Sequence, residues 1–153
     1  MRRADREIQA LDEIVAVLDR CETIRLGING GDYPYVVPLS FGYALEDGRL
    51  AVYFHGAGEG LKHTLLAADS RVCIEADMCH RFVEHGGDFT CEYESVIGFG
   101  RAQQVSGSEA ERGLDLLMAH CGFAGRKYDR RVLSITTVYK ITVEQITGKR
   151  RRI

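Results

Sequence analysis

Residues 49–62, RLAVYFHGAGEGLK, carry the pattern that indicates both the fold and a candidate site. Side chains alternate between two faces from 50 to 55, which predicts a strand ending at His55. Glycines follow at 56, 58 and 60, and a helix is predicted from about 60 to 68 with Lys62 near its start. Glycine N–H groups, the partial positive charge of a helix N-terminus and a lysine together suit a phosphate. The stretch therefore predicts a strand–turn–helix unit that binds an anion.

The periodicity of the remaining chain predicts a mainly β protein with short turns between most strands. Strands are expected at 24–28, 33–45, 49–55, 71–76, 90–105 and 134–146. Helices are expected from Asp5 to about Leu18, from 60 to 68, and from a capping box at Ser106 and Glu109 to about Gly122. Residues 78–87 are expected to form a loop.

Strands and helices do not alternate along the chain, and neither a GxGxxG nor a Walker motif is present. The sequence therefore disfavours a doubly wound nucleotide-binding fold. We predict an antiparallel β-barrel with accessory α-helices, formed by residues 1–153 as a single domain.

Composition excludes several classes of function. The chain has 153 residues and a net charge of −2, so no general attraction to nucleic acid or anionic lipid is expected. Neither a signal peptide nor a membrane span is expected, because no apolar run approaches about 20 residues. Five cysteines without framework spacing indicate reduced thiols and a cytoplasmic protein. The basic run 149–152 is expected to be solvated, or else to close over an anionic ligand.

Five segments together resemble the FMN-binding split-barrel proteins related to pyridoxamine 5′-phosphate oxidase, and within them the nitroimidazole-resistance (Nim) branch. They are MRRADREI (1–8), YPYVVPLSFGY (33–43), RLAVYFHGAGEGLK (49–62), CEYESVIGFGRA (91–102) and YKITVEQITGKR (139–150). The resemblance implies a six-stranded antiparallel split barrel that forms a homodimer with FMN between the subunits. It also implies an oxidoreductase that takes electrons from a small donor and reduces a small acceptor, of nitroaromatic type in the Nim branch.

The resemblance also implies a set of site residues. His55 is the candidate catalytic residue and lies beside the flavin. The expected cofactor-binding residues are Val36, Val37, Pro38 and Leu39 along the ring, Tyr53, Phe54 and His55 on the central strand, Gly58, Gly60 and Lys62 at the phosphate, and Tyr93, Glu94, Ser95 and Val96, which approach from the long strand of the same or the other subunit. Relatives often carry a small hydroxyl residue where this chain has Gly56, which removes one phosphate donor.

Each site residue also has a plainer interpretation. His55 is either close to the flavin or merely caps the helical turn, and Lys62 is either a phosphate ligand or a solvated lysine. Tyr53 shares the strand face of His55 and is the tyrosine expected to stack near a flavin. A mixture of cysteine and histidine suits tetrahedral zinc, and such residues occur at Cys73, Cys79, His80, His85 and Cys91. Because no CxxC or HxxxH pair is present, no metal is predicted.

Two other functions remain open from the sequence. A pyridoxamine 5′-phosphate oxidase would need an arginine cluster for its substrate phosphate, and the spacing of Arg150, Arg151 and Arg152 does not reproduce that enzyme's terminal motif. A non-enzymatic flavin- or haem-binding module is the second alternative. In a haem protein, a histidine such as His55, His63 or His120 would ligate the iron.

Overall fold

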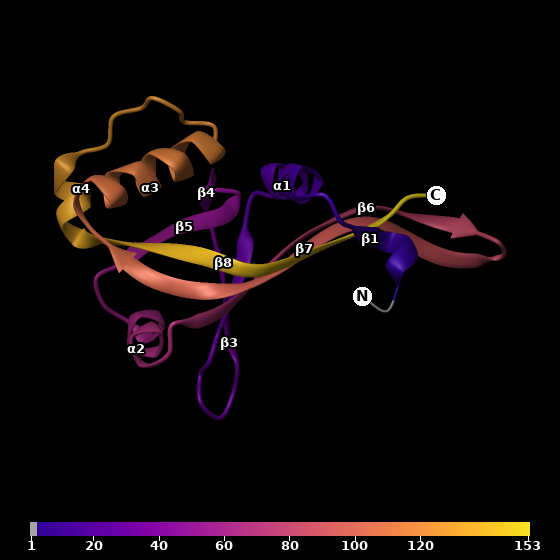
Figure 1. The fold of residues 1–153 in the computed structure, drawn as a ribbon, viewed down its shortest axis with the longest axis horizontal. Coiled ribbons are helices and arrows are strands. Elements are labelled where there is room, and N and C mark those ends of the chain that lie inside the picture. The colour runs from indigo at the N-terminus through magenta and orange to yellow at the C-terminus, as the bar shows by residue number, and fades with distance from the viewer. Residues whose placement is uncertain (1–2) are drawn as a thin grey trace.

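The computed structural model describes residues 3–153, which form one antiparallel sheet decorated by helices (Figure 1). The strands are β1 (Glu7–Ile8), β2 (Ile24–Ile28), β3 (Tyr35–Leu39), β4 (Gly42–Glu46), β5 (Arg49–Ala57), β6 (Arg71–His85), β7 (Asp88–Val105) and β8 (Thr136–Arg151). The helices are α1 (Leu11–Arg20), α2 (Leu61–Ala68), α3 (Gly107–His120) and α4 (Arg130–Ile135), with a 3-10 turn at Ala4–Arg6. The prediction of a mainly β chain with accessory helices is confirmed.

The order of the strands makes the sheet a split barrel. It runs β3-β2-β6-β7-β8-β5-β4, and β1 pairs with the carboxy-terminal part of β8. The two edge strands, β3 and β4, are joined only by Ser40 and Phe41. Three residue steps span at most about 11 Å, so the sheet must curl to bring its edges near each other. The split-barrel prediction is confirmed, with eight strands in an unclosed sheet where six were expected.

Alternate residues of the central strands fill the interior of the barrel. Leu26 of β2, Ile74 of β6 and Ile141 of β8 are almost fully buried there. Gly98 and Gly100 of β7 face the same interior, where a Cβ on Gly98 would lie 3.0 Å from Ile74. These glycines therefore permit close approach of the strands, as their alternation on one face indicates.

The outer face of β5 is covered by α3, which also packs on β4 and β8. A polar network fixes this contact. The hydroxyl of Tyr53 lies 2.8 Å from Glu46 and 2.6 Å from Glu109, and it accepts a hydrogen bond from Arg112. Lys140 pairs with both carboxylates. Hydrogen bonds from Lys140 and Arg112 lower the pKa of Glu46 to about 2, so this network is ionised at neutral pH.

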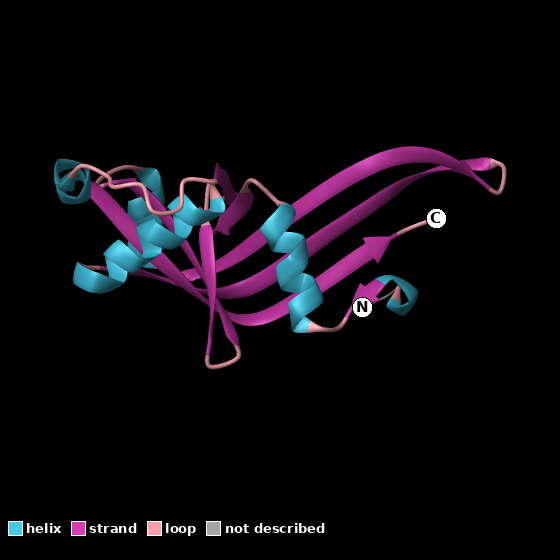
Figure 2. Cartoon of the chain, turned by 90° about the horizontal axis from the view of Figure 1, so that it is seen from above, coloured by secondary structure: helices cyan, strands magenta, loops and turns pink. Residues whose placement is uncertain are grey.

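A long hairpin projects from the barrel, and we call residues 77–95 of β6 and β7 the arm. Figure 2 shows the two strands extending well beyond the helices, to a tight turn at Gly86 and Gly87. The expected loop at 78–87 is therefore wrong, because most of that segment is strand. A β-bulge between Cys79 and Arg81 places His80 out of the regular pairing. Two consecutive residues on one side of a strand break its period of two, which hides the strand from sequence patterns.

Both chain ends differ from the expected structure. The first helix begins at Leu11 rather than near Asp5, because Ile8 pairs with Gly148 in β1. The basic run 149–152 is largely strand rather than a solvated tail, and Arg150 forms an ion pair with Glu94.

The expected capping box before α3 is also not formed, since the side chain of Ser106 makes no cap hydrogen bond.

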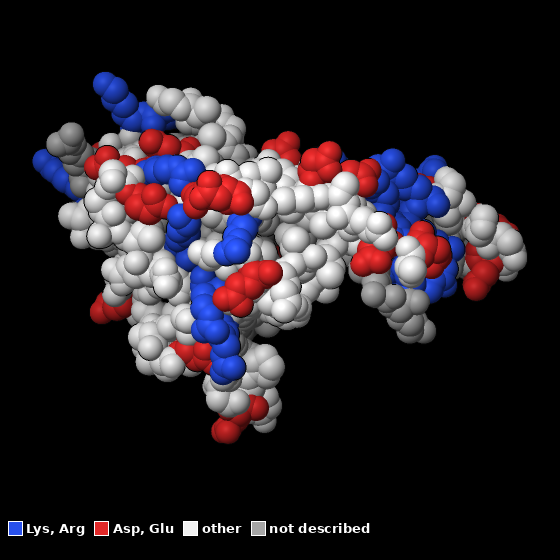
Figure 3. Space-filling model, viewed as in Figure 1, with Lys and Arg blue, Asp and Glu red and all other residues white. Residues whose placement is uncertain are grey.

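Charged side chains are unevenly distributed over the surface. Figure 3 shows Lys and Arg side chains gathered with acidic ones beside β1 and the end of β8, and a band without charged residues over the middle of β7. Within residues 3–153, no helix is both long enough and apolar enough to span a bilayer.

Candidate functional site

The junction of β5 and α2 forms the site that the sequence predicts. β5 is buried from Leu50 to Phe54, and then His55 emerges from the sheet into solvent. Gly58, Glu59 and Gly60 form the turn between β5 and α2. The φ of 121° at Gly60 strongly favours glycine. α2 begins at Leu61 without a side-chain cap, so its first N–H groups remain available to an anion.

Two basic side chains converge on Gly56. A Cβ at this position would lie 2.8 Å from the Nζ of Lys62 and 3.5 Å from the Nε2 of His63. The absence of a side chain at Gly56 therefore makes room for the lysine amine beside the backbone of β5. The Nζ of Lys62 donates a long hydrogen bond of 3.5 Å to the carbonyl oxygen of His55 and lies 5.4 Å from the centre of the Phe54 ring.

The electrostatics of this junction favour an added anion. In the part of the chain that the structure describes, Lys62 forms no ion pair, and its only hydrogen bond is to the carbonyl of His55. Burial lowers the pKa of Lys62, and an anionic ligand would offset this effect. Partial burial, together with the Lys62 charge, lowers the pKa of His55 below its ordinary value of 6.5. The imidazole of His55 is therefore neutral at pH 7.

His63 and Tyr139 belong to the same site. The sequence indicated His63 only as a candidate haem ligand and did not indicate Tyr139. The Nδ1 of His63 lies 2.8 Å from the hydroxyl of Tyr139, and the Tyr139 ring stacks on Phe54 at 5.1 Å. The two residues are 76 positions apart, so only the fold brings them together. The bond orients the His63 ring with Nε2 toward Gly56. Lys62 and His63, adjacent on a short helix, were the only available signal.

Two predicted residues of β5 lie inside the protein. Tyr53 and Phe54 have no exposed surface, since the ring of Tyr53 lies beneath α3 and that of Phe54 faces the barrel interior. The structure thus does not bring the Tyr53 ring to the junction, and it gives this ring no free face for stacking. Phe54 contributes indirectly by packing under Lys62 and Tyr139.

The predicted residues of β3 lie on an edge strand. Val36 and Pro38 are exposed, whereas Val37 and Leu39 pack against the core. Pro38 is tolerated because β3 pairs only with β2 and the free edge needs no N–H donor. Val36 and Pro38 are therefore the two members of this group with side chains available to a ligand.

The predicted residues of β7 are far from His55 within one chain. His55 pairs with Val138, whereas Val96 pairs with Gly148, ten residues further along β8. Ten residues of extended strand span about 33 Å. The segment 93–96 therefore cannot contact a ligand at His55 of its own chain.

The side chains of this β7 segment also divide between two faces. Tyr93 and Ser95 lie half-buried on the outer face, together with Ile97 and Phe99, which are 41% and 52% exposed. Glu94 and Val96 are buried on the inner face. Any ligand contact from Glu94 or Val96 would have to come from the main chain.

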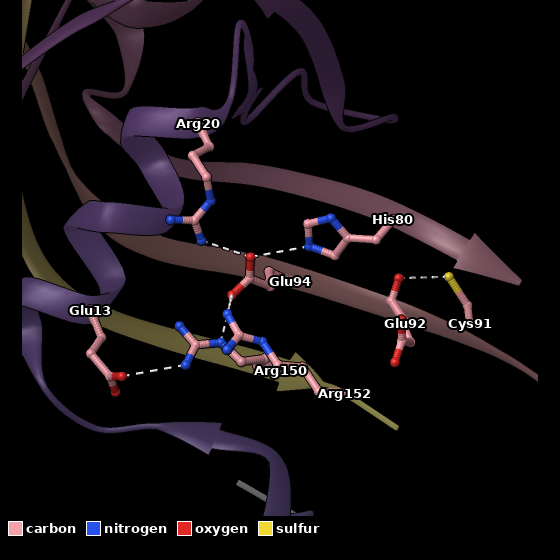
Figure 4. A network of polar contacts seen from close by, with 8 residues as sticks. All are labelled: Glu13, Arg20, His80, Cys91, Glu92, Glu94, Arg150 and Arg152. Atoms are coloured by element: carbon pink, nitrogen blue, oxygen red, sulfur yellow. Dashed lines mark hydrogen bonds and ion pairs between the residues drawn. The ribbon is translucent and has the colours of Figure 1, made fainter. Parts of the chain in front are cut away.

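Glu94 is instead the centre of a buried ionic network at the base of the arm (Figure 4). Its oxygens accept hydrogen bonds from Arg20 at 2.7 Å, Arg150 at 2.5 Å and Arg152 at 3.4 Å, and His80 lies at 3.1 Å. Burial opposes ionisation of Glu94, but these hydrogen bonds outweigh it and lower its pKa to about 2. The network is structural, because each partner is directed at the carboxylate rather than at open space.

Potential metal ligands do not cluster in the described residues. No group of three or more His, Cys, Asp or Glu side chains between residues 3 and 153 is arranged to hold a metal ion. The candidate zinc ligands are instead spread over both faces of β6 and β7, and their cysteines are free thiols. They are Cys73, Cys79, His80, His85 and Cys91.

Comparison with known proteins gives the family. A family model described as pyridoxamine 5′-phosphate oxidase matches residues 10–150. The chain belongs to this pyridoxamine 5′-phosphate oxidase family. Membership confirms the resemblance that the sequence segments indicated. No curated protein sequence matches the chain.

Solved structures agree with the family and its Nim branch. A candidate 5-nitroimidazole antibiotic resistance protein of Bacteroides thetaiotaomicron is 28% identical, with a TM-score of 0.84 over 94% of this chain and 85% of its own. The flavocytochrome Anf3 of Azotobacter vinelandii is 20% identical, with a TM-score of 0.81. This similarity covers 100% of this chain and 72% of the Anf3 chain. A FAD-binding protein of Mesorhizobium loti is 24% identical, with a TM-score of 0.66. This similarity covers 96% of this chain and 98% of the M. loti chain. The latter two share the fold of the pyridoxamine 5′-phosphate oxidase family.

Proposed function

We propose that this protein is a homodimeric FMN-binding oxidoreductase that reduces small nitroaromatic compounds. The observation that carries the proposal is the junction of β5 and α2, where three features lie together: a lysine amine with no ion pair among the described residues, an uncapped helix N-terminus and an exposed neutral imidazole. The similarity to a candidate 5-nitroimidazole resistance protein supports the acceptor class. The five free cysteines support a cytoplasmic location.

The residues at the junction fit the phosphate of FMN. The amine of Lys62 would supply a charge-assisted hydrogen bond, and the first N–H groups of α2 and the glycine turn at 58–60 would supply further donors. The exposed Val36 and Pro38 of β3 would offer apolar contact to the ring. When bound, FMN would supply hydride and electron transfer, while the protein supplies binding and orientation.

His55 would serve the acceptor rather than the phosphate. Its ring is exposed next to the glycine turn, and the lowered pKa leaves one ring nitrogen protonated and the other free at neutral pH. A neutral imidazole can donate a hydrogen bond to a nitro oxygen and exchange a proton as the group is reduced. Because the imidazole itself exchanges the proton, this role needs no acidic side chain from the same chain.

The second subunit would complete the site. Ser95 and Tyr93 lie about 36 Å and about 43 Å along the sheet from His55 of their own chain, so a contact with the same FMN requires another copy. Ile97 and Phe99 are exposed on the same face of β7 and would supply apolar area for association. We therefore place the dimer interface on the outer face of β7.

The first test is the visible absorption spectrum of the purified protein, with release and identification of the chromophore. A yellow protein that yields FMN is expected, and it should reduce a 5-nitroimidazole anaerobically with a nicotinamide donor. A Soret band would instead favour the haem-binding alternative, with His55 or His63 as ligand. His120 is the least suited to this role, because its Nε2 bonds the carbonyl of Cys21 and its ring packs on Phe41. A colourless protein that takes up no added FMN would contradict the proposal.

Replacing Lys62 by alanine is expected to weaken FMN binding by about 10- to 100-fold, because one charge-assisted hydrogen bond to the phosphate is lost. The dissociation constant is measured by fluorescence quenching on titration of the apoprotein. Lys127→Ala, which removes an exposed lysine outside the site, is the control and should bind FMN normally. Equal affinity in the two variants would make Lys62 a solvated lysine.

Replacing His55 by alanine is expected to leave FMN binding within about twofold and to lower turnover of a nitroaromatic acceptor by about 100-fold, the size of a typical general acid–base contribution. Steady-state rates and bound flavin are measured on the same preparations. His85→Ala, at the exposed tip of the arm, is the control. Unchanged turnover in His55→Ala would remove the imidazole from the mechanism.

A further inference from the structure

Two cysteines lie in contact on the arm, away from the β5–α2 junction. The Sγ atoms of Cys79 and Cys91 are 2.7 Å apart, compared with about 2.05 Å for a covalent S–S bond. Among the described residues, no other pair of cysteine sulfurs is in contact. Cys79 is exposed and Cys91 is half-buried, so the pair is open to solvent from one side.

The bulge in β6 explains why these two residues meet. Cys79 pairs with Tyr93 and Cys91 pairs with Phe82, so the cysteines lie diagonally across the ladder on its outer face. His80 and Arg81 both turn to the inner face, where His80 contacts Glu94 and Arg81 bonds Glu92. Bulges increase the local twist of the strands, and this twist brings the diagonal pair into contact.

We infer that Cys79 and Cys91 form a reversible dithiol–disulfide site that reacts with peroxides. This site lies apart from the β5–α2 junction of its own chain, although Cys79 pairs with Tyr93 of the proposed interface. Its chemistry does not depend on a bound flavin. Cys79 is the attacking residue because it is the more exposed of the two cysteines. Cys91 is the resolving residue. The Cys79 sulfur raises the pKa of the Cys91 thiol to about 11, and the thiol also donates a 3.3 Å hydrogen bond to the carbonyl of Glu92 (Figure 4).

The reaction balances with hydrogen peroxide as the two-electron oxidant. The Cys79 thiolate attacks one peroxide oxygen, the O–O bond breaks, and the departing hydroxide takes up a proton to form water. The resulting sulfenic acid is attacked by the Cys91 sulfur, so that the S–S bond forms, the S–O bond breaks and a second water leaves with the Cys91 proton. Two thiols are oxidised and one peroxide is reduced, and a dithiol reductant reverses the change.

The test is intact-mass and thiol analysis of the reduced full-length protein after treatment with equimolar hydrogen peroxide. Free thiols should fall from five to three per chain, with a mass loss of two hydrogens. Tryptic peptides 72–81 and 82–101 should become linked, and fragmentation distinguishes Cys79 from Cys73 in the first peptide. Dithiothreitol should restore all five thiols.

Single variants separate this pair from general thiol oxidation. Cys79→Ser and Cys91→Ser should each abolish the mass loss of two hydrogens. Cys121→Ser removes an exposed cysteine that has no second sulfur in contact, and it should leave the linkage intact. The proposal is overturned if peroxide leaves five free thiols, if it oxidises Cys121 first, or if the linked peptides come from two different chains on a non-reducing gel.

Discussion

Replacing Glu94 by alanine is expected to lower the free energy of unfolding by about 3–5 kcal/mol, the usual cost of removing one partner from a buried ionic network. The side chain of Glu94 is 2% exposed and is the shared acceptor for Arg20, Arg150 and Arg152. Without it, Arg20 of α1 would lose its ionic link to β7, and Arg150 of β8 would retain, among the described residues, only its pair with Glu13. Urea denaturation followed by circular dichroism measures the change.

A surface pair of the same chemistry provides the control. Glu144 bonds Arg101 at 3.0 Å, but both side chains are 53% exposed. Glu144→Ala should therefore cost less than about 1 kcal/mol. If the two variants lose equal stability, the network at Glu94 is no more than a surface ion pair.

Acid should destabilise the protein through the same carboxylate. Hydrogen bonds lower the pKa of Glu94 to about 2, from an ordinary value of 4.5, so the folded state binds fewer protons than the unfolded state between these values. The contribution of Glu94 to stability is complete above about pH 4.5 and is lost as the pH falls toward 2. Urea midpoints measured across this range should decline more steeply in the parent protein than in Glu94→Gln. Parallel curves for the two proteins would be inconsistent with a paired Glu94.

Replacing Phe99 by glutamate is expected to separate the proposed dimer and to remove FMN in the same step. A charge placed in the apolar part of an interface should weaken association by about 100-fold. Light scattering measures the mass and absorbance measures the bound flavin. Loss of both together follows from a shared site, whereas Lys62→Ala should release flavin from an intact dimer.

Phe123→Glu is the matched control for this variant. Phe123 is 45% exposed, close to the 52% of Phe99, but lies in the segment after α3 rather than on β7. It should leave both the mass and the flavin content unchanged. A Phe99→Glu protein that remains dimeric would place the interface elsewhere, and a flavin-bound monomer would show that one chain makes a complete site.

The sequence predicted those parts of the fold whose causes are local. The alternation in β5, the glycine turn and the start of α2 all lie within fourteen residues, so the pattern at 49–62 was sufficient.

The errors have non-local causes. Ile8 fits a helical pattern, but its partner Gly148 lies at the far end of the chain. The arm was hidden because the bulge at His80 breaks the alternation. The ionic network of Glu94 was not visible either, because its hydrogen-bond partners Arg20 and Arg150 lie 74 and 56 residues away. No sequence pattern connects such distant residues.

The distance between His55 and Tyr93 along the sheet has a genetic consequence if the dimer forms as proposed. Each site would take its phosphate lysine from one gene product and its β7 segment from the other. Two inactive alleles, one defective at Lys62 and one defective on the outer face of β7 at Tyr93 and Ser95, could then complement each other. In a mixed dimer one of the two sites would contain both defects, while the other would contain none and would be fully functional.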